Sequence, residues 1–211
     1  MKRIIFLVAI MALPLTNFAQ KKRIMLFDKY SQGTVKLFNM TRINAPLNYD
    51  ASNKAMMYMD GENEMILMNK EQVDSILIGS HKFIYANGTY LECIALENGV
   101  VYIDWLLKDV NRGFKGVYGQ VTQSKVESIN TNYWQRGKYL NQSTEVYSRI
   151  NENRYLFETK GKMVVCKSKK NLLNLFKEKK ELINGYINKN NLDFTRVPDA
   201  LNLIDYCLSL K

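Results

Sequence analysis

Residues 82–108 read KFIYANGTYLECIALENGVVYIDWLLK, and this stretch decides the fold. Two Asn-Gly pairs, Asn87-Gly88 and Asn98-Gly99, separate three runs that are rich in β-branched and aromatic residues. Asn-Gly favours a two-residue type I′ turn, because both central positions of that turn need a positive φ. The stretch therefore predicts three consecutive antiparallel strands, a β-meander.

Two-residue turns also fix which residues of the meander lie opposite each other. They place Tyr85 opposite Tyr90, and Leu96 opposite Val101. Opposite residues share a face, and one face collects large apolar side chains, each worth roughly 1.5–3 kcal/mol when buried. This predicted core face carries Phe83, Tyr85, Tyr90, Ile94, Leu96, Val101, Ile103, Trp105 and Leu107.

Polar residues within the meander leave chemical alternatives open. On the core face, Glu92 is either an edge carboxylate that bends out to water or an acid with a pKa raised by apolar surroundings. On the other face, Lys82, Cys93 and Asp104 fall in one lateral row. A lysine beside a thiol would lower its pKa, and a row of structural neighbours is the simpler interpretation. Because His81 falls on the core face, the register predicts no catalytic dyad with Cys93.

The first 19 residues have the features of a secretory signal peptide. Lys2 and Arg3 precede an apolar run over residues 4–15, which is too short to span a bilayer comfortably. Cleavage is expected after Ala19, and no later stretch is long and apolar enough for a transmembrane helix. We therefore expect an exported protein, in the periplasm, at the cell surface or in the extracellular medium.

The chain is basic, with 30 Lys and Arg residues against 20 Asp and Glu residues. Removing Lys2 and Arg3 with the signal peptide leaves 28 basic and 20 acidic residues, a net charge of +8. Export argues against nucleic acid as the partner of this charge. An anionic glycan or lipid surface is the weaker alternative, since most lysines fall in helix-like or loop stretches where a solvated face explains them.

The cysteines and methionines give no sign of a metal or cofactor site. Cys93, Cys166 and Cys207 are an odd number in apolar segments, which favours buried free thiols or at most one disulfide. One histidine and three scattered cysteines supply no Cys-x-x-Cys or His-x-x-x-His pair. The methionines of residues 54–69 are interpreted as flexible core filling rather than a copper(I) site.

The segments around the meander extend it into an antiparallel β-domain over residues 20–168. After Ser168 the hydrophobic period changes from two to 3.6, which predicts a short helix from about Lys169 and a longer one ending near Asn190. Pro198 fits the first turn of a last helix. The fold class is thus α+β: a meander or sandwich-like β-domain followed by a small helical appendage, residues 169–211, packed on it. The other expected strands are 21–28, 34–40, a hairpin over 54–69, 73–78, 145–150, 154–160 and 162–168, with a turn at 31–33 and a loop over 45–50.

A long polar loop is expected at about 110–144. Loops beyond about 15 residues are usually functional or disordered, and the aromatic residues of this one argue against disorder. Tyr133, Trp134, Arg136 and Tyr139 mix rings with hydrogen-bonding groups, as sugar sites and protein interfaces do. They form either a lid over the second face of the sheet or a surface that binds a glycan or another envelope protein.

A series of short motifs runs through the chain: Asn48-Tyr49-Asp50 before a hairpin, Val73-Asp74-Ser75-Ile76 with Lys82-Phe83, Tyr118-Gly119 with Thr122-Gln123-Ser124, and Asn171-Leu172-Leu173 with Ile187-Asn188-Lys189-Asn190. Together they resemble exported proteins of Bacteroidota-type bacteria, from about residue 30 onward. The resemblance implies export and architecture, and it implies no catalytic activity.

Two classes of function stay open. The first is a non-catalytic exported protein that binds a ligand or forms part of the cell-envelope surface. The second is a hydrolase for glycan or peptide substrates, whose acidic residues are dispersed along the sequence. The sequence points to no catalytic residue, and a cleft that holds two or more carboxylates would favour the hydrolase.

Overall fold

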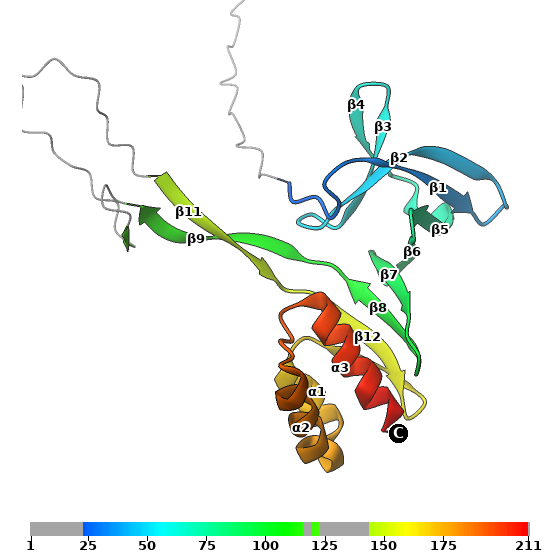
Figure 1. Ribbon diagram of the computed structural model, residues 1–211. Coiled ribbons are helices and arrows are strands. Elements are labelled where there is room, and N and C mark those ends of the chain that lie inside the picture. The colour runs from blue at the N-terminus through cyan, green and yellow to red at the C-terminus, as the bar shows by residue number, and fades with distance from the viewer. Residues whose placement is uncertain (1–22, 116–119, 123–143, 211) are drawn as a thin grey trace, which may run out of the picture.

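The computed structural model describes residues 23–115, 120–122 and 144–210. Within these ranges the protein is β-rich, all strand pairs are antiparallel, and three α-helices lie near the C-terminus (Figure 1). The strands are β1 (Ser31–Leu37), β2 (Arg42–Asp50), β3 (Ala55–Asp60), β4 (Asn63–Ile66), β5 (Val73–Ile78), β6 (His81–Ala86), β7 (Thr89–Ala95), β8 (Val100–Asp104), β9 (Leu107–Lys115), β10 (Val121–Thr122), β11 (Thr144–Asn151), β12 (Arg154–Thr159) and β13 (Lys162–Cys166). The helices are α1 (Lys169–Leu175), α2 (Lys180–Asn190) and α3 (Val197–Ser209), with short 3-10 turns at Lys70–Gln72 and Lys177–Lys179.

Ten of these strands form one sheet in the order β13-β12-β8-β7-β6-β5-β1-β2-β3-β4. A second, smaller sheet has the order β10-β9-β11. Neighbours along the chain mostly pair with each other, as expected for a meander; the pairs β1–β5, β8–β12 and β9–β11 join strands that are not consecutive. The described ranges contain no helix with the length and hydrophobicity needed to cross a membrane.

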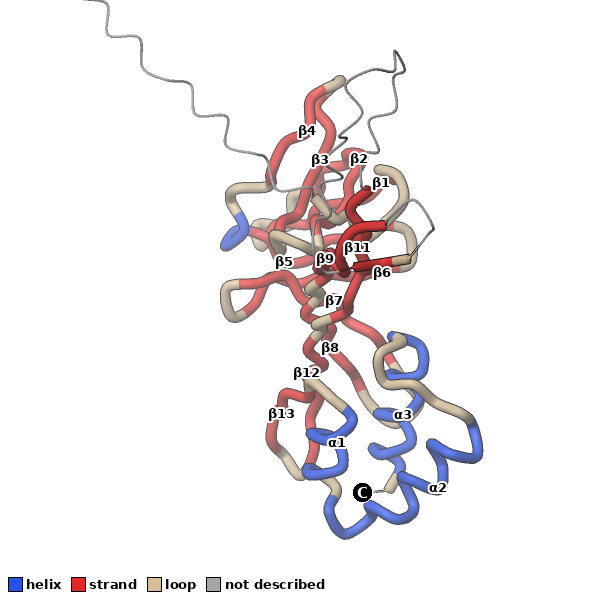
Figure 2. Tube along the Cα trace, turned by 90° about the vertical axis from the view of Figure 1, so that its left-hand side faces the viewer, coloured by secondary structure: helices blue, strands red, loops and turns tan. Residues whose placement is uncertain are grey.

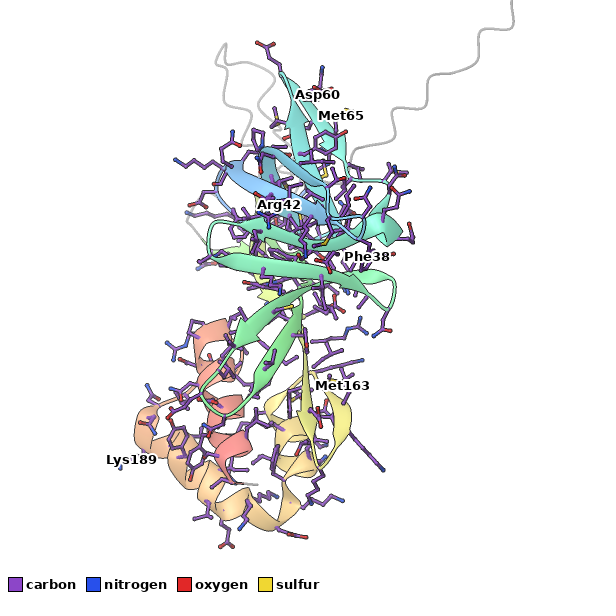
Figure 3. All side chains as sticks on the ribbon, turned by 90° about the vertical axis from the view of Figure 1, so that its right-hand side faces the viewer. Phe38, Arg42, Asp60, Met65, Met163 and Lys189 are labelled. Atoms are coloured by element: carbon purple, nitrogen blue, oxygen red, sulfur yellow. The ribbon has the colours of Figure 1, made fainter. Side chains whose placement is uncertain are left out.

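Two hydrophobic cores lie on either side of a narrow waist at β7, β8 and β12 (Figure 2). The N-terminal core packs between β1, β2, β3, β5, β6 and β7 and includes Tyr49, Met56, Ile76, Phe83 and Tyr90. The C-terminal core joins β8, β12 and β13 to the three helices. It includes Ile103, Phe157, Leu172, Ile183 and Cys207. Trp105 packs against both cores. Exposed apolar side chains remain on both halves, among them Phe38 and Met163 (Figure 3).

The helices begin and end where local chemistry places them. Ser168 caps α1, because its hydroxyl oxygen accepts a hydrogen bond from the Asn171 N–H at 3.2 Å. Asn191 ends α2 in the left-handed region with φ 49°. Pro198 lies in the first turn of α3. The predicted change from strands to helices after Ser168 is therefore confirmed.

An arm formed by β9 and β11, with the short β10 paired to the end of β9, extends from the body as the continuation of β8 and β12 (Figure 1). The pairs Asp104↔Arg154 in the body and Leu107↔Asn151 in the arm belong to one continuous register. The arm therefore begins at Leu107, whose N–H donates to the Ala51 carbonyl at 3.1 Å. Residues 110–115, predicted as loop, belong to strand β9 of this arm.

The meander prediction is correct for one turn and wrong for the next. Tyr85 lies opposite Tyr90 as predicted. On the other side of β7, Val101 pairs with Ile94 rather than Leu96. Residues 96–99 form a four-residue loop closed by the Leu96 N–H and the Gly99 carbonyl at 2.8 Å. A shift of two residues keeps the paired side chains of β7 and β8 on their predicted faces.

Near the N-terminus three local predictions are wrong. The expected strand over 21–28 contributes a single bridge, Met25↔Asp50. The expected turn at 31–33 lies inside β1, where Gly33 is required by packing: a Cβ there would lie 2.5 Å from the Leu77 carbonyl oxygen. The expected loop over 45–50 is part of β2. Pro46 fits there because pairing with β3 starts only at the next residue.

Candidate functional site

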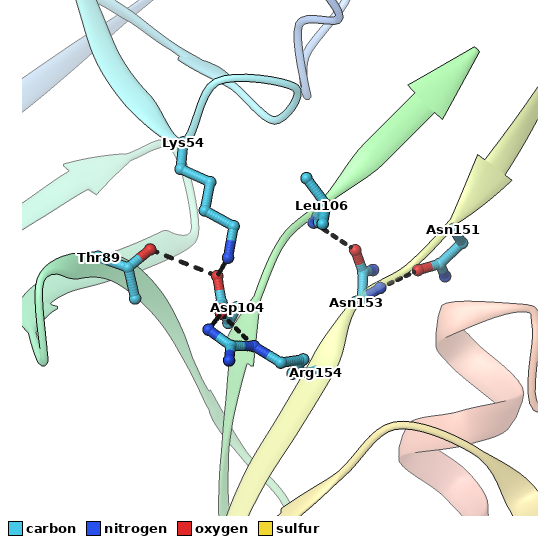
Figure 4. Close-up of polar contacts among 7 residues, drawn as sticks. All are labelled: Lys54, Thr89, Asp104, Leu106, Asn151, Asn153 and Arg154. Carbon is cyan, nitrogen blue, oxygen red and sulfur yellow. Dashed lines mark hydrogen bonds and ion pairs between the residues drawn. The ribbon is translucent and has the colours of Figure 1, made fainter. Parts of the chain in front are cut away.

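The ribbon formed by β8–β9 and β11–β12 is interrupted where the arm leaves the body (Figure 4). Asn153 bridges the interruption, because its Oδ1 accepts from the Leu106 N–H at 2.8 Å. The Asn153 N–H donates to Asn151 Oδ1 at 2.8 Å, and the Glu152 N–H donates to the Leu106 carbonyl at 2.9 Å. Side-chain amides thus replace some of the ladder hydrogen bonds at this junction, and one backbone bond remains.

Beside the junction, Asp104 is fully buried between two cationic side chains (Figure 4). Lys54 Nζ donates to its Oδ1 at 2.6 Å, and Arg154 Nε donates to its Oδ2 at 2.6 Å. The Thr89 hydroxyl donates to Oδ1 at 3.3 Å. Because both of its oxygens bond to protein partners, Asp104 links β8, β12 and the β2–β3 turn. These bonds give it a structural role rather than that of a catalytic acid or base.

The contact between Lys54 and Asp104 also helps to explain the unusual backbone conformation of Lys54. Its φ is 57°, a left-handed conformation that lysine rarely adopts. Such a conformation persists where surrounding contacts determine it. Here Asp50 accepts four hydrogen bonds from Ser52 and Asn53 and shapes the turn, and the bond to Asp104 holds the lysine side chain.

Glu92 is also a buried tether. It is 1% exposed, so the expectation that it bends out to water is wrong. The alternative, an acid among apolar groups only, does not describe it either. His81 Nδ1 lies 2.5 Å from its Oε1, and the Trp105 Nε1–H donates to its Oε2 at 2.5 Å. Glu92, on β7, therefore links β6 through His81 with Trp105, which packs against both cores.

The predicted row of Lys82, Cys93 and Asp104 is only partly formed. Lys82 lies opposite Cys93, but Tyr102 takes the next place in the row and Asp104 pairs with Arg154. Burial raises the pKa of Cys93, and Lys82 opposes that rise only in part. This environment favours a structural thiol over an activated nucleophile.

The other two thiols lie in the C-terminal core. Cys93, Cys166 and Cys207 are all free, as the odd count favoured. Burial raises the pKa of Cys166 to about 11 and that of Cys207 to about 12. Both are therefore protonated and inert near neutral pH. The described ranges also hold no cluster of three or more His, Cys, Asp or Glu side chains that could bind a metal ion.

The ligand residues predicted from the sequence, Tyr133, Trp134, Arg136 and Tyr139, lie outside the described residues. Three of the hollows among the described residues bear on function. One of about 470 Å³ lies at the base of the arm, lined by Ile24, Ser52, Leu107, Lys108, Asp109, Val110 and Tyr147. One of about 500 Å³ lies on the surface at residues 177–182.

The third hollow, called here the polar hollow, has a volume of about 390 Å³ and lies between β12, the start of α1 and the loop before α3. Two residues that line it, Asn153 and Tyr155, each carry a buried polar atom, Nδ2 and Oη, that has no hydrogen-bond partner among the described residues. Burial raises the pKa of Tyr155, and the side-chain amides of Asn151 and Asn153 oppose this rise in part. Unpaired buried groups are rare and need an explanation.

Sequence reasoning missed the polar hollow because its wall comes from three separate segments, 151–155, 167–169 and 192–195. The one local signal was the Asn151-Glu152-Asn153 run between two predicted strands, since asparagine is unfavourable in a strand interior. Comparison of the chain with protein-family models, with curated proteins and with solved structures finds no match.

Proposed function

We propose that this chain is an exported protein that binds a ligand at the cell envelope without catalysing a reaction. One observation carries the proposal: the buried carboxylates serve the fold, and two of the unpaired buried polar groups, those of Asn153 and Tyr155, belong to residues that line a hollow. Asp50, Glu92 and Asp104 each bond to protein partners, and none of them lines any of the three hollows named above. Asn153 Nδ2 and Tyr155 Oη are hydrogen-bonding atoms that no partner among the described residues uses.

The alternative function, a hydrolase with dispersed acids, has weaker support. A glycoside hydrolase needs two carboxyl groups that face each other across the scissile bond, one of them with a raised pKa. The hollow at residues 177–182 does hold two carboxylates, Glu178 and Glu181, but both are exposed among lysines. Asp193 on the polar hollow is exposed as well, and hydrogen bonds from Thr195 lower its pKa, which suits a permanently ionised group.

The architecture and the location belong to the same proposal. We infer a sandwich-like β-domain over residues 20–168 that carries the helices as an appendage, and a signal peptide that ends at Ala19. Mass spectrometry of the protein from periplasmic, surface and culture-medium fractions should find a mature N-terminus at Gln20. A protein that keeps residues 1–19 and stays in the cytoplasm would overturn the proposed location.

The binding function is tested with the mature chain, purified and mixed with an insoluble cell-envelope fraction. We expect the folded protein to sediment with the envelope and the heat-unfolded protein to sediment less. We also expect no new soluble sugar or peptide in the supernatant. Release of such a product, at a rate that scales with the amount of folded protein, would favour the hydrolase and overturn the proposal.

A further inference from the structure

We propose that the polar hollow binds one neutral sugar ring of a glycan, with sugar oxygens accepting hydrogen bonds from Asn153 Nδ2 and Tyr155 Oη. This inference deepens the binding function proposed above and rests on it. It is carried by the two unpaired donors, by the aromatic surface beside them and by the balance of charge at the rim.

The first step concerns the donors. Asn153 is 3% exposed, and its Oδ1 is taken by the Leu106 N–H, which can only donate. The orientation of the amide is therefore fixed, and Nδ2 is the end left without a partner. Tyr155 is 2% exposed, and its hydroxyl also has no hydrogen-bond partner within the part of the chain that the structure describes. Two unused donors on residues that line the same hollow fit a ligand that brings acceptor oxygens.

The second step concerns shape and apolar surface. Phe194 packs edge-on against Tyr155, with ring centroids 5.4 Å apart at 76°. It is half-buried and lines the hollow together with Leu192. The C–H face of a sugar ring can pack on such an apolar surface while its hydroxyls hydrogen-bond to the side-chain amides that line the hollow. A volume of about 390 Å³ also falls in the range of small-ligand sites, roughly 300–1,000 Å³.

The third step concerns charge. The rim carries Lys167 and Lys169, but it also carries the carboxylate of Asp193. The Asp193 carboxylate offsets one of the two lysines, which weakens the attraction for a simple anion and leaves room for a neutral ligand. Two hydroxyls, of Ser168 and Thr195, add polar contacts at the rim.

The fourth step concerns rigidity. The Asn151 Nδ2–H donates to the Thr195 carbonyl at 3.1 Å, which ties the loop before α3 to the end of β11. The Asp193 N–H donates to Asp199 Oδ2 at 2.9 Å, which ties the same loop to α3. A wall held in place before binding loses little conformational freedom when the ligand arrives.

The test is calorimetric or NMR titration of the mature chain with N-acetylglucosamine and glucose as neutral probes, and with glucuronate, acetate and phosphate as anionic ones. We expect a neutral sugar to bind. Tyr155→Phe removes only the unpaired hydroxyl, so it should leave the melting temperature unchanged or slightly higher. It should weaken sugar binding roughly three- to tenfold, the effect of one neutral hydrogen bond.

Tyr90→Phe is the matched control. Tyr90 is also buried, with an unpaired hydroxyl, but it lies in the N-terminal core away from the hollow. This variant should bind sugar as the natural protein does. Equal affinity of Tyr155→Phe and the natural chain would overturn the site and leave the binding function standing, as would failure of every probe sugar while the protein still sediments with the envelope.

Two further outcomes would also overturn the site. Binding of acetate or phosphate without any neutral sugar would identify a simple anion site. A drop of several degrees in the melting temperature of Tyr155→Phe would show that the hydroxyl is paired within the fold. Release of a product from the envelope fraction would instead count against the proposed function itself, so the two failures are distinguishable.

Discussion

Arg154 lies directly opposite Asp104 in the β8–β12 pair, and its Nε donates to Asp104 Oδ2 at 2.6 Å. These strands are 50 residues apart in the sequence and are not joined by a hairpin turn. A slip of one residue would turn Arg154 to the other face of the sheet and leave the buried carboxylate with Lys54 alone. The ion pair therefore specifies the register of the waist and, through it, of the arm.

The first prediction removes both cations from Asp104. The double variant Lys54→Met, Arg154→Met leaves a fully buried carboxylate without a countercharge, so we expect the free energy of unfolding to fall by about 3–5 kcal/mol. Adding Asp104→Asn should recover part of that loss. Urea denaturation measures both. Lys108→Met is the control: its partner Glu152 is exposed, so the cost should stay below about 1 kcal/mol. A double variant no less stable than this control would contradict the tether.

The second prediction concerns Gly33, which occupies the middle of β1. Gly33→Ala brings a Cβ to within 2.5 Å of the Leu77 carbonyl oxygen and 2.7 Å of Leu47 Cδ1. The backbone must shift, and we expect a loss of about 1–3 kcal/mol. Gly185→Ala is the matched control, because nothing lies within 4 Å of the new Cβ in the exposed α2 position. It should stabilise by about 0.5–1 kcal/mol. Thermal melts that rank the two variants the other way would contradict the close packing.

Local turn chemistry explains which parts of the fold were predictable. Asn87 and Gly88 have φ values of 53° and 78°, and Lys160 and Gly161 have 52° and 69°, as two-residue hairpin turns require. Asn98-Gly99 carries the same signal and does not form that turn. The Asn98 N–H instead donates to Asp205 Oδ1 of α3 at 2.8 Å. A contact 107 residues away overrides the local preference, and no local pattern could reveal it.

The candidate site was less predictable than the fold. The sequence concentrated aromatic and polar residues in 133–139, and those positions lie outside the described residues. The same mixture of side chains occurs in the polar hollow, where Tyr155, Asn153 and Phe194 come from segments about 40 residues apart. Asp104 was placed beside Cys93 because the register was counted from a turn that does not form. Pairing between non-consecutive strands has no signature in either strand alone.

The third prediction is a loss of stability at alkaline pH. Burial raises the pKa of Cys166 from 9.0 to about 11 and that of Cys207 from 9.0 to about 12. Above pH 9 the unfolded chain therefore binds fewer protons than the native protein, so the free energy of unfolding falls as pH rises. For Cys166 the fall amounts to about 2–3 kcal/mol, complete near pH 11. The buried tyrosines Tyr49 and Tyr90, whose pKa values burial also raises, act in the same direction.

Urea midpoints between pH 8 and 11 measure this effect. Cys166→Ala should be less stable than the natural chain at pH 8, because it leaves a cavity. Its stability should then fall less steeply between pH 9 and 11, because one of the titrating thiols is gone. Parallel pH profiles for the two proteins would show that the thiol is not the source of the alkaline loss.

The last prediction concerns Trp105, which packs against both cores and donates to the buried carboxyl of Glu92. Trp105→Phe keeps an aromatic ring but leaves a buried acceptor unpaired, so it should cost about 1–3 kcal/mol. Trp105→Ala also removes the packing between the cores, for a total of about 3–5 kcal/mol. If this contact couples the cores, calorimetry of Trp105→Ala should show two transitions where the natural chain shows one.

His81→Ala is the control, and it removes the other partner of Glu92. The His81 side chain is 43% exposed, so water can take its place beside the carboxylate. It should cost less than about 1 kcal/mol, and a larger loss for His81→Ala than for Trp105→Phe would mean that the outer contact, rather than the tryptophan, holds Glu92 in the fold.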